Sequence, residues 1–232
     1  MPYSATIPVA GSIHYRSIGM AAVAIAGLPT VWNVVARNEY RRHTIEKAVG
    51  SKKAGAYLLA AGIFVASVLR DYLFRNAMVH TPSSVFPILC THAFGPDSAG
   101  FARSVMRGTG TALLLSGTTL VVSSFLRLGV TGTYLGDYFD ILMDERVTAF
   151  PFSHFDNPMY LGATLNFLAA SIIQNNAVGV LLTGLVALVY HVSTRYFESP
   201  FTAMIYSKRG GGPGSRCLGD EDDVGRQKHK NI

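Results

Sequence analysis

The sequence predicts an all-α integral membrane protein with three to four membrane-spanning helices and a further kinked or re-entrant helix near the N-terminus. Only 15% of the 232 residues are charged, against about 25% in ordinary soluble domains. The mean hydropathy is positive, at +0.29. Three apolar runs, residues 54–74, 111–130 and 163–194, are each long enough to cross the hydrocarbon layer of a bilayer. We therefore assign residues 1–206 to one membrane domain.

The charge of the chain favours lipid headgroups over nucleic acid as the partner. The formal net charge is +6, but the basic residues flank apolar runs and form no stripe interleaved with aromatic residues. Anionic headgroups are therefore the expected partners. The two cysteines, Cys90 and Cys217, lie far apart without metal-ligand spacing. Neither a disulfide framework nor a metal site is predicted.

The N-terminal apolar run, residues 17–36, is interrupted by Pro29 and Asn33. A proline inside a helix removes a backbone hydrogen bond and favours a bend. We therefore expect a tilted, kinked or re-entrant helix here and not a regular span. A basic block, residues 37–53, follows, and it could act as a positively charged membrane anchor alone.

The runs 54–74 and 111–130 are predicted as regular spans, the first about 30 Å long. Its polar pair Arg70-Asp71 lies near the end, where an arginine side chain can reach the interface. Between the two runs, residues 75–110 lose helical periodicity and contain several prolines and glycines. This segment is predicted to be a loop.

The run 163–194 contains no Asp, Glu, Lys or Arg and is too long for one ordinary span. The polar residues 174–176 near its middle leave two arrangements open, one long tilted helix or a hairpin of two short helices. Residues 132–145 are acidic and aromatic, and we expect them to lie at the membrane interface. Residues 207–232 are Gly-rich and charged, without a hydrophobic face, and are predicted to be a disordered tail.

Polar residues gather in two clusters, residues 150–162 and 196–202, which bracket the last apolar run. Asn157-Pro158 is a typical helix start, so capping alone could explain part of the first cluster. Glu198 is an ionisable group at the edge of an apolar run, which makes it a functional candidate. The clusters predict chemistry at a lipid interface, and their candidate residues are His154, Asp156, Asn157, Tyr160 and Glu198.

Five blocks of the sequence carry a resemblance to a known family. They are Trp32-Asn-Val-Val-Ala-Arg-Asn-Glu-Tyr40, Gly132-Thr-Tyr-Leu-Gly-Asp-Tyr-Phe139, Arg146-Val-Thr-Ala-Phe-Pro-Phe152, Asp156-Asn-Pro-Met-Tyr-Leu-Gly162 and Glu198-Ser-Pro-Phe-Thr-Ala-Met-Ile-Tyr206. Together they resemble the phospholipid N-methyltransferases, over roughly residues 28–206. The resemblance implies methylation of phosphatidylethanolamine, or of its mono- and dimethyl derivatives, to phosphatidylcholine, with S-adenosylmethionine as the methyl donor and a phospholipid of the bilayer as the partner. More remotely, the Asn-Pro-x-Tyr-x-Gly and Glu pair resembles the prenylcysteine carboxyl methyltransferases, which are the alternative.

The resemblance also implies a set of cofactor-binding residues. The Gly-x-Gly motif of the family falls on Leu115-Ser116-Gly117, where only the second glycine is present, and a literal Gly108-Thr-Gly110 stands earlier in the chain. The Glu-Glu pair of the family becomes Glu198-Ser199, which leaves one carboxylate. The cofactor-binding residues implied are Leu115, Ser116, Gly117, Asn157, Glu198 and Ser199.

The implied reaction is the in-line attack of a headgroup amine on a sulfonium methyl group. The protein must chiefly align the reacting atoms and keep the amine unprotonated. His154 and Asp156 are the candidates to take the amine proton, and Tyr160 offers an aromatic face to the methylated ammonium. These three are the predicted catalytic residues.

Two non-enzymatic alternatives explain less of the sequence. A small transporter should show internal repeats, and none is found. A scaffold would not explain the polar clusters. Lys228 and Lys230 resemble the dilysine retrieval signal of endoplasmic-reticulum membrane proteins, which predicts that membrane and a cytosolic C-terminus.

Overall fold

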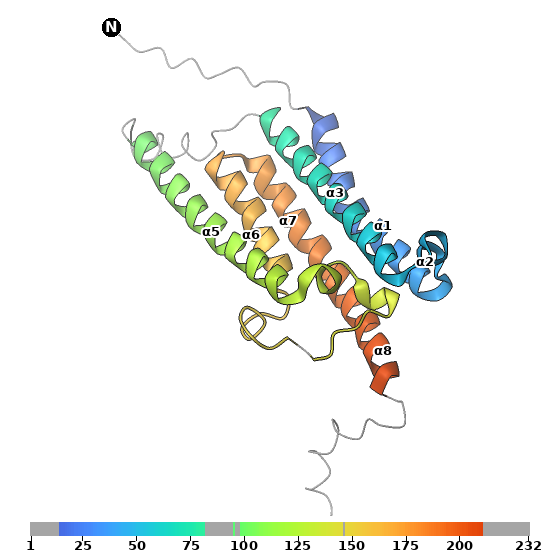
Figure 1. The fold of residues 1–232 in the computed structure, drawn as a ribbon. Coiled ribbons are helices and arrows are strands. Elements are labelled where there is room, and N and C mark those ends of the chain that lie inside the picture. The colour runs from blue at the N-terminus through green and yellow to red at the C-terminus, as the bar shows by residue number, and fades with distance from the viewer. Residues whose placement is uncertain (1–13, 82–94, 96–97, 146, 211–232) are drawn as a thin grey trace, which may run out of the picture.

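The computed structural model describes residues 14–81, 95, 98–145 and 147–210 (Figure 1). Within these ranges the chain forms helices and no strand, which confirms the predicted all-α class. The elements are α1 (Tyr15–Arg42), α2 (Thr44–Val49), α3 (Lys52–Val79), α5 (Ser98–Thr133), η1 (Gly136–Phe139), α6 (Pro158–Ile173), α7 (Ala177–Val192), η2 (Ser193–Glu198) and α8 (Ser199–Gly210).

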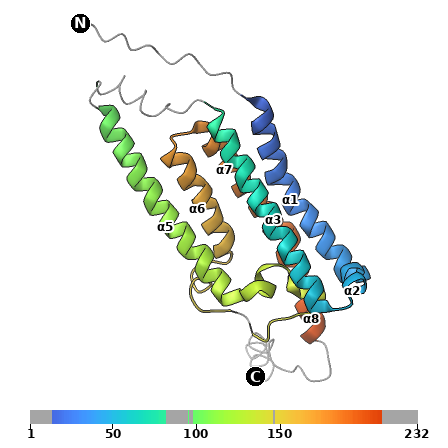
Figure 2. The same ribbon diagram turned by 45° about the horizontal axis from the view of Figure 1, so that its top comes forward.

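Four helical stretches of the described chain are long and apolar enough to cross a membrane, and α6 is a shorter apolar helix. The long helices run side by side as a bundle in both views (Figures 1 and 2). The prediction of a multi-span helical membrane protein is confirmed. The four stretches are Tyr15–Arg42, Lys52–Val79, Ser98–Phe139 and Ala177–Lys208.

The N-terminal helix α1 is continuous over 28 residues and passes through Pro29. Such a helix is about 42 Å long at 1.5 Å per residue, and it contains no turn at which the chain could re-enter the same side. The re-entrant alternative is therefore wrong, and α1 is one of the four candidate spans. Next to the proline, the Thr30 hydroxyl donates to the Ala26 carbonyl at 2.9 Å.

The loop predicted for residues 75–110 is wrong at both of its ends, where the structure has helices, and residues 82–94 and 96–97 lie outside the described residues. Helix α3 continues to Val79, and α5 begins at Ser98. Gly100 and Gly108, which favoured a loop, lie inside α5 with open space around them. A glycine costs a helix only about 1 kcal/mol, and a helix as long as α5 tolerates that cost.

The run 163–194 is a hairpin of α6 and α7, as one of the two predicted arrangements has it. Asn175 adopts a left-handed conformation with φ of 51° at the turn. The Asn176 side chain caps α7 by accepting from Gly179 N at 2.9 Å, and its amide donates to the Met78 carbonyl at 3.0 Å. The polar residues near the middle of the run therefore form the turn and fasten it to the end of α3.

Residues 132–145, which were predicted to lie at the membrane interface, lie at one end of the bundle and are partly buried. Tyr138 and Phe139 of η1 are fully buried, and the Tyr138 ring stacks on Phe201 of α8 at 4.9 Å. This segment closes one end of the bundle, where it contacts α1, α3, α5 and α8. Its aromatic residues are apolar enough to fill that end, which local amphipathicity could not reveal.

The last helix, α8, continues to Gly210, beyond the Tyr206 boundary predicted for the membrane domain. The remainder of the predicted disordered tail lies outside the described residues, as do Lys228 and Lys230.

Candidate active site

A cavity of about 480 Å³ lies between α1, α3, α5, α6, α7 and α8 at the end of the bundle that η1 closes. Its wall combines carboxylates, hydroxyls and apolar side chains. Its polar lining residues include Arg70, Asp137, Asp156, Asn157, Tyr160, Tyr190, Glu198, Ser199 and Thr202.

The Glu198 carboxylate is the centre of a hydrogen-bonded group within this wall. Its Oε2 accepts from the Tyr160 hydroxyl at 2.6 Å. Its Oε1 accepts from Asn33 Nδ2 at 3.1 Å and from Ser193 Oγ at 2.9 Å. Residues of α1, α6 and η2 therefore fix one carboxylate from both sides. Because α6 and α7 form a hairpin, the two polar clusters of the sequence meet at Glu198.

The wide helical turn η2, Ser193–Glu198, positions this carboxylate. In a regular α-helix, residues five apart point in different directions, since each residue turns the chain by about 100°. The wider turn brings Ser193 and Glu198 onto one face, so the Ser193 hydroxyl reaches the Glu198 side chain. Single wide turns of this kind occur often at functional sites.

Asp156 and Asn157 both line the cavity. Asn157 occupies the N-cap position of α6 and Pro158 follows at the first helical position, but the Asn157 side chain makes no capping hydrogen bond. Helix capping by the side chain therefore does not explain why an asparagine stands at this position. Ser199 also lines the cavity, and the neighbouring Thr202 hydroxyl donates to Asp137 Oδ2 at 3.0 Å.

His154 lies apart from the cavity wall, on an exposed turn of the chain before α6. Its Nδ1 is 2.7 Å from Ser153 Oγ. Its ring lies 6.2 Å from the ring of Phe150 and 6.5 Å from that of Phe155. The structure thus brings together Asp156, Asn157, Tyr160, Glu198 and Ser199, but not His154.

Leu115, Ser116 and Gly117 do not line the cavity. The Leu115 side chain is 65% exposed, and the Ser116 hydroxyl donates to the Ala112 carbonyl of its own helix at 2.9 Å. Gly117 is buried against α6, where a Cβ would lie 2.6 Å from the Gly162 carbonyl oxygen. Gly117 and Gly162 let the backbones of α5 and α6 approach closely, as small residues do between membrane helices.

The earlier glycine pair also gives no cavity contact. Gly108 has open space around it, whereas Gly110 packs against Ile173 and the backbone of Ala169. On this geometry Gly110, like Gly117, allows α5 to pack closely against α6, whereas Gly108 packs against no other helix of the described chain.

Arg70 lines the cavity, although the sequence predicted that its side chain would reach the membrane interface. The side chain does not reach the interface but is buried, with 6% exposure. Its guanidinium donates to the Tyr190 hydroxyl and pairs with Asp71 Oδ1 at 2.9 Å. The signal was present, because a charged pair within an apolar run is a functional candidate by default.

Asn33 and Asp137 are site residues that were not predicted from the sequence. A signal was present for Asn33, because an amide side chain in an apolar run needs a polar partner. Both residues also lie within blocks that resemble the phospholipid N-methyltransferases. Contacts between segments that are distant in the chain place both residues at the site.

A group of potential metal ligands stands outside the cavity. Glu39, His43 and Glu46 have ligand atoms within 4.8 Å of one another. The Glu39 carboxylate, however, accepts from the backbone N–H groups of Ile45 at 2.6 Å and Glu46 at 3.0 Å. It therefore caps the first turn of α2, a role that accounts for its burial.

The chain was compared with protein-family models and with known proteins. A family model described as phospholipid methyltransferase matches residues 105–209. The chain is 41% identical to phosphatidyl-N-methylethanolamine N-methyltransferase of Saccharomyces cerevisiae, over 82% of this chain and 85% of that protein. It is 44% identical to the protein of the same name in Emericella nidulans, over 83% of this chain and 87% of that protein.

A mammalian relative is similar to the chain to a comparable degree, in both identity and coverage. The chain is 43% identical to human phosphatidylethanolamine N-methyltransferase, over 84% of this chain and 91% of that protein. No solved structure matches the chain. A methyltransferase requires a methyl donor, and the cavity around Glu198 is a polar recess between the helices. The sequence similarity, which covers more than four-fifths of this chain for each of these relatives, shows that the chain belongs to the phospholipid methyltransferase family.

Proposed function

We propose that this protein transfers methyl groups from S-adenosylmethionine to the headgroup amine of phosphatidylethanolamine or its mono- and dimethyl derivatives, producing phosphatidylcholine. The names of the relatives in yeast, Emericella and human support this substrate class. The structural observation that carries the proposal is the Glu198 carboxylate, held by Tyr160, Asn33 and Ser193 at the wall of the cavity.

The hydrogen-bond donors and positive charges of S-adenosylmethionine match the carboxylates that line the cavity. Asp137, Asp156 and Glu198 supply three carboxylates, which suit the ribose hydroxyls, the ammonium group and the cationic sulfonium centre of that molecule. When bound, S-adenosylmethionine supplies an activated methyl group. Because three donors already fix Glu198, it is suited to binding and orientation, and it is not the base.

The amine proton needs an acceptor near the reacting atoms. Asp156 lines the cavity and belongs to an exposed turn, so it takes the proton directly or through one water molecule. His154, two positions earlier in the chain, passes that proton to solvent. Tyr160 and Tyr190, whose rings lie 4.7 Å apart, offer aromatic faces to the increasingly methylated ammonium.

The lipid reaches the cavity from the side, between α3 and α5. An apolar groove of about 530 Å³ lies there, and it shares Val121, Thr133, Tyr134 and Met159 with the cavity. The acyl chains can remain in the bilayer along this groove while the headgroup enters the polar recess. Such a route avoids extracting the substrate from the hydrocarbon layer.

We further propose that the active-site end faces the cytosol in the endoplasmic-reticulum membrane. The basic residues around α2, the start of α6 and helix α8 all lie at that end of the bundle (Figure 1). The positive-inside tendency places such an end in the cytosol, where S-adenosylmethionine is made. The pair Lys228 and Lys230 supports the choice of membrane.

The direct test is methyl transfer by the purified full-length protein. The protein is incubated with methyl-labelled S-adenosylmethionine and vesicles containing phosphatidylethanolamine, its monomethyl derivative or neither. We expect label in the two amine lipids and none in the third sample. Label on a prenylcysteine peptide would instead favour the carboxyl methyltransferase alternative, and label in no acceptor would contradict the enzymatic proposal.

A further inference from the structure

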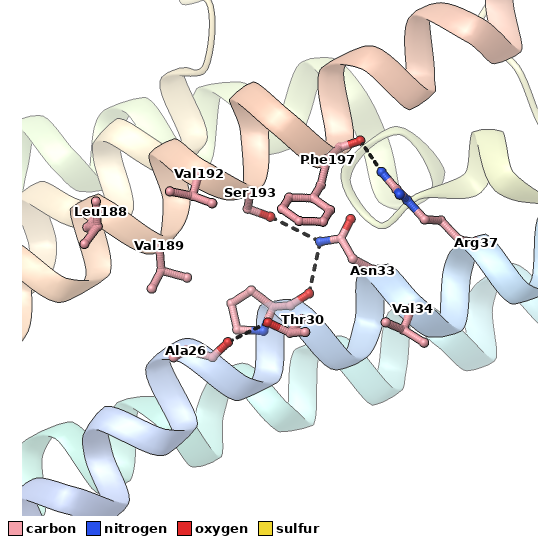
Figure 3. Close-up of a pocket in the computed structure, with 11 residues that line it drawn as sticks. Ala26, Thr30, Asn33, Val34, Arg37, Leu188, Val189, Val192, Ser193 and Phe197 are labelled. Atoms are coloured by element: carbon pink, nitrogen blue, oxygen red, sulfur yellow. Dashed lines mark hydrogen bonds between the residues drawn. The ribbon is translucent and has the colours of Figure 1, made fainter.

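A second recess lies on the opposite side of Asn33 from the cavity. This groove, of about 330 Å³, runs between α1 and the α7–η2 segment (Figure 3). Most of its wall is aliphatic, with Val34 on α1 and Leu188, Val189 and Val192 on α7. Because both helices are candidate membrane spans, the groove faces the acyl region of a bilayer.

One end of the groove carries polar atoms that lack partners. Asn33 is 5% exposed, and its Nδ2 donates to the Pro29 carbonyl, Ser193 Oγ and Glu198 Oε1. Its Oδ1, by contrast, is buried and accepts no hydrogen bond from the described residues. Burying an amide oxygen without a donor costs about 1–3 kcal/mol in protein contexts. An N–H donor from a ligand would satisfy it.

Arg37 lies one helical turn further along α1, at the same end of the groove. One guanidinium nitrogen donates to the Phe197 carbonyl at 2.8 Å, and the group lies 5.3 Å from the centre of the Phe197 ring. The guanidinium is thus held by Phe197 (Figure 3) and by the Phe201 ring, whose centre lies 4.8 Å away. Its Nε is buried and is the nitrogen that lacks a partner among the described residues.

These atoms define a specific chemical complement. An acceptor and a cation four residues apart on one helix lie about 5–6 Å apart at their Cβ atoms. A phospholipid with an amine headgroup presents an anionic phosphate and an N–H-bearing ammonium joined by two carbons. We propose that the groove between α1 and α7 binds an aminophospholipid, with its phosphate on Arg37, its ammonium on Asn33 Oδ1 and an acyl chain along Leu188, Val189 and Val192.

This site is distinct from the route into the cavity between α3 and α5. Asn33 links the two recesses, since it lines the groove and its nitrogen donates to Glu198, which lines the cavity. A lipid bound to Asn33 Oδ1 therefore fixes the amide that orients Glu198. A fully methylated headgroup has no N–H to donate, so the site distinguishes lipids that can still be methylated from those that cannot.

The test uses the full-length protein in detergent micelles with a phosphatidylethanolamine that carries a photoactivatable group in one acyl chain. No S-adenosylmethionine is added, so the result does not depend on the proposed methyl transfer. We expect cross-links in the peptides of α1 and α7 that line the groove. Unlabelled phosphatidylethanolamine should compete about tenfold better than phosphatidylcholine, the effect of roughly one hydrogen bond to a charged group.

Blocking variants make the assignment specific. Leu188→Trp and Val192→Trp should each reduce groove labelling about tenfold. Leu181→Trp is the matched control on the same exposed face of α7, two turns away and outside the groove, and it should label as the unmodified protein does. Arg37→Gln should remove the part of the preference for phosphatidylethanolamine over diacylglycerol that depends on the phosphate, and it should leave the preference over phosphatidylcholine unchanged.

Two results would overturn the proposal. Equal labelling of Leu188→Trp, Val192→Trp and Leu181→Trp would show that the groove holds no lipid of its own. Equal competition by phosphatidylcholine and phosphatidylethanolamine would show that it holds bulk bilayer lipid without headgroup recognition.

Discussion

The Tyr160 hydroxyl donates to Glu198 Oε2 at 2.6 Å, although the two residues are 38 positions apart in the chain. The almost uncharged hairpin of α6 and α7 lies between them. This bond joins the start of α6 to the end of η2, and it brings the two polar clusters of the sequence to one wall of the cavity. If the cavity is the site of methyl transfer, activity must depend on this pair.

Glu198→Gln should lower kcat/KM for methyl transfer by roughly tenfold to a hundredfold. The amide keeps the shape of the carboxylate but removes the charge that three donors now face, and a hydrogen bond to a charged group contributes about 1.5–3 kcal/mol. Steady-state rates with labelled S-adenosylmethionine measure the effect. Turnover near that of the unmodified protein would exclude Glu198 from the site.

Tyr160→Phe should weaken both activity and stability, because it leaves Glu198 Oε2 without its donor. The expected loss of stability is about 1–3 kcal/mol, measured by thermal unfolding in detergent. Tyr196→Phe is the control, since that side chain is close in sequence to Glu198 but 67% exposed. Similar losses in the two variants would show that the hydrogen bond to Glu198 is unimportant.

Gly117→Ala should destabilise the protein by about 1–3 kcal/mol, since the new methyl group would meet the Gly162 carbonyl and force α5 away from α6. Gly108→Ala has open space and should be neutral or stabilising by up to about 1 kcal/mol, because alanine favours the helix. Melting temperatures of the two variants give the comparison. The reverse order would contradict the close packing of α5 against α6 at Gly117.

Single cysteines at Gly50 and Asn175 should be accessible from opposite sides of the membrane. Gly50 lies in the turn between α2 and α3, and Asn175 lies in the turn between α6 and α7, at opposite ends of the bundle (Figure 1). Both native cysteines are first replaced by alanine. In sealed microsomes, a membrane-impermeant thiol reagent should label the Gly50 variant directly and the Asn175 variant only after permeabilisation. The opposite pattern would place the active site in the lumen.

The class of fold and most of the span positions could be predicted from local patterns in the sequence. Hydropathy and the absence of charge are local properties of a run, so residues 54–74 and 111–130 could be recognised as helices without any partner. The asparagines of the hairpin turn were readable for the same reason, because polar side chains within an apolar run need a turn, a cap or a polar contact. Asp156, Tyr160 and Glu198 were identified as candidates from their place beside an apolar run and from family motifs.

The contacts between these candidate residues depend on tertiary packing and could not be predicted from the sequence. The partners of Glu198 come from three different elements, and Asn33 carries no sequence feature that predicts a contact 165 residues away. Arg70 is directed inward and Gly117 faces α6 because of how neighbouring helices pack. A helix sequence specifies which residues share a face but not which neighbour that face meets. The pairing of faces is set by close packing between helices, and it separated the residues that line the cavity from those that hold the bundle together.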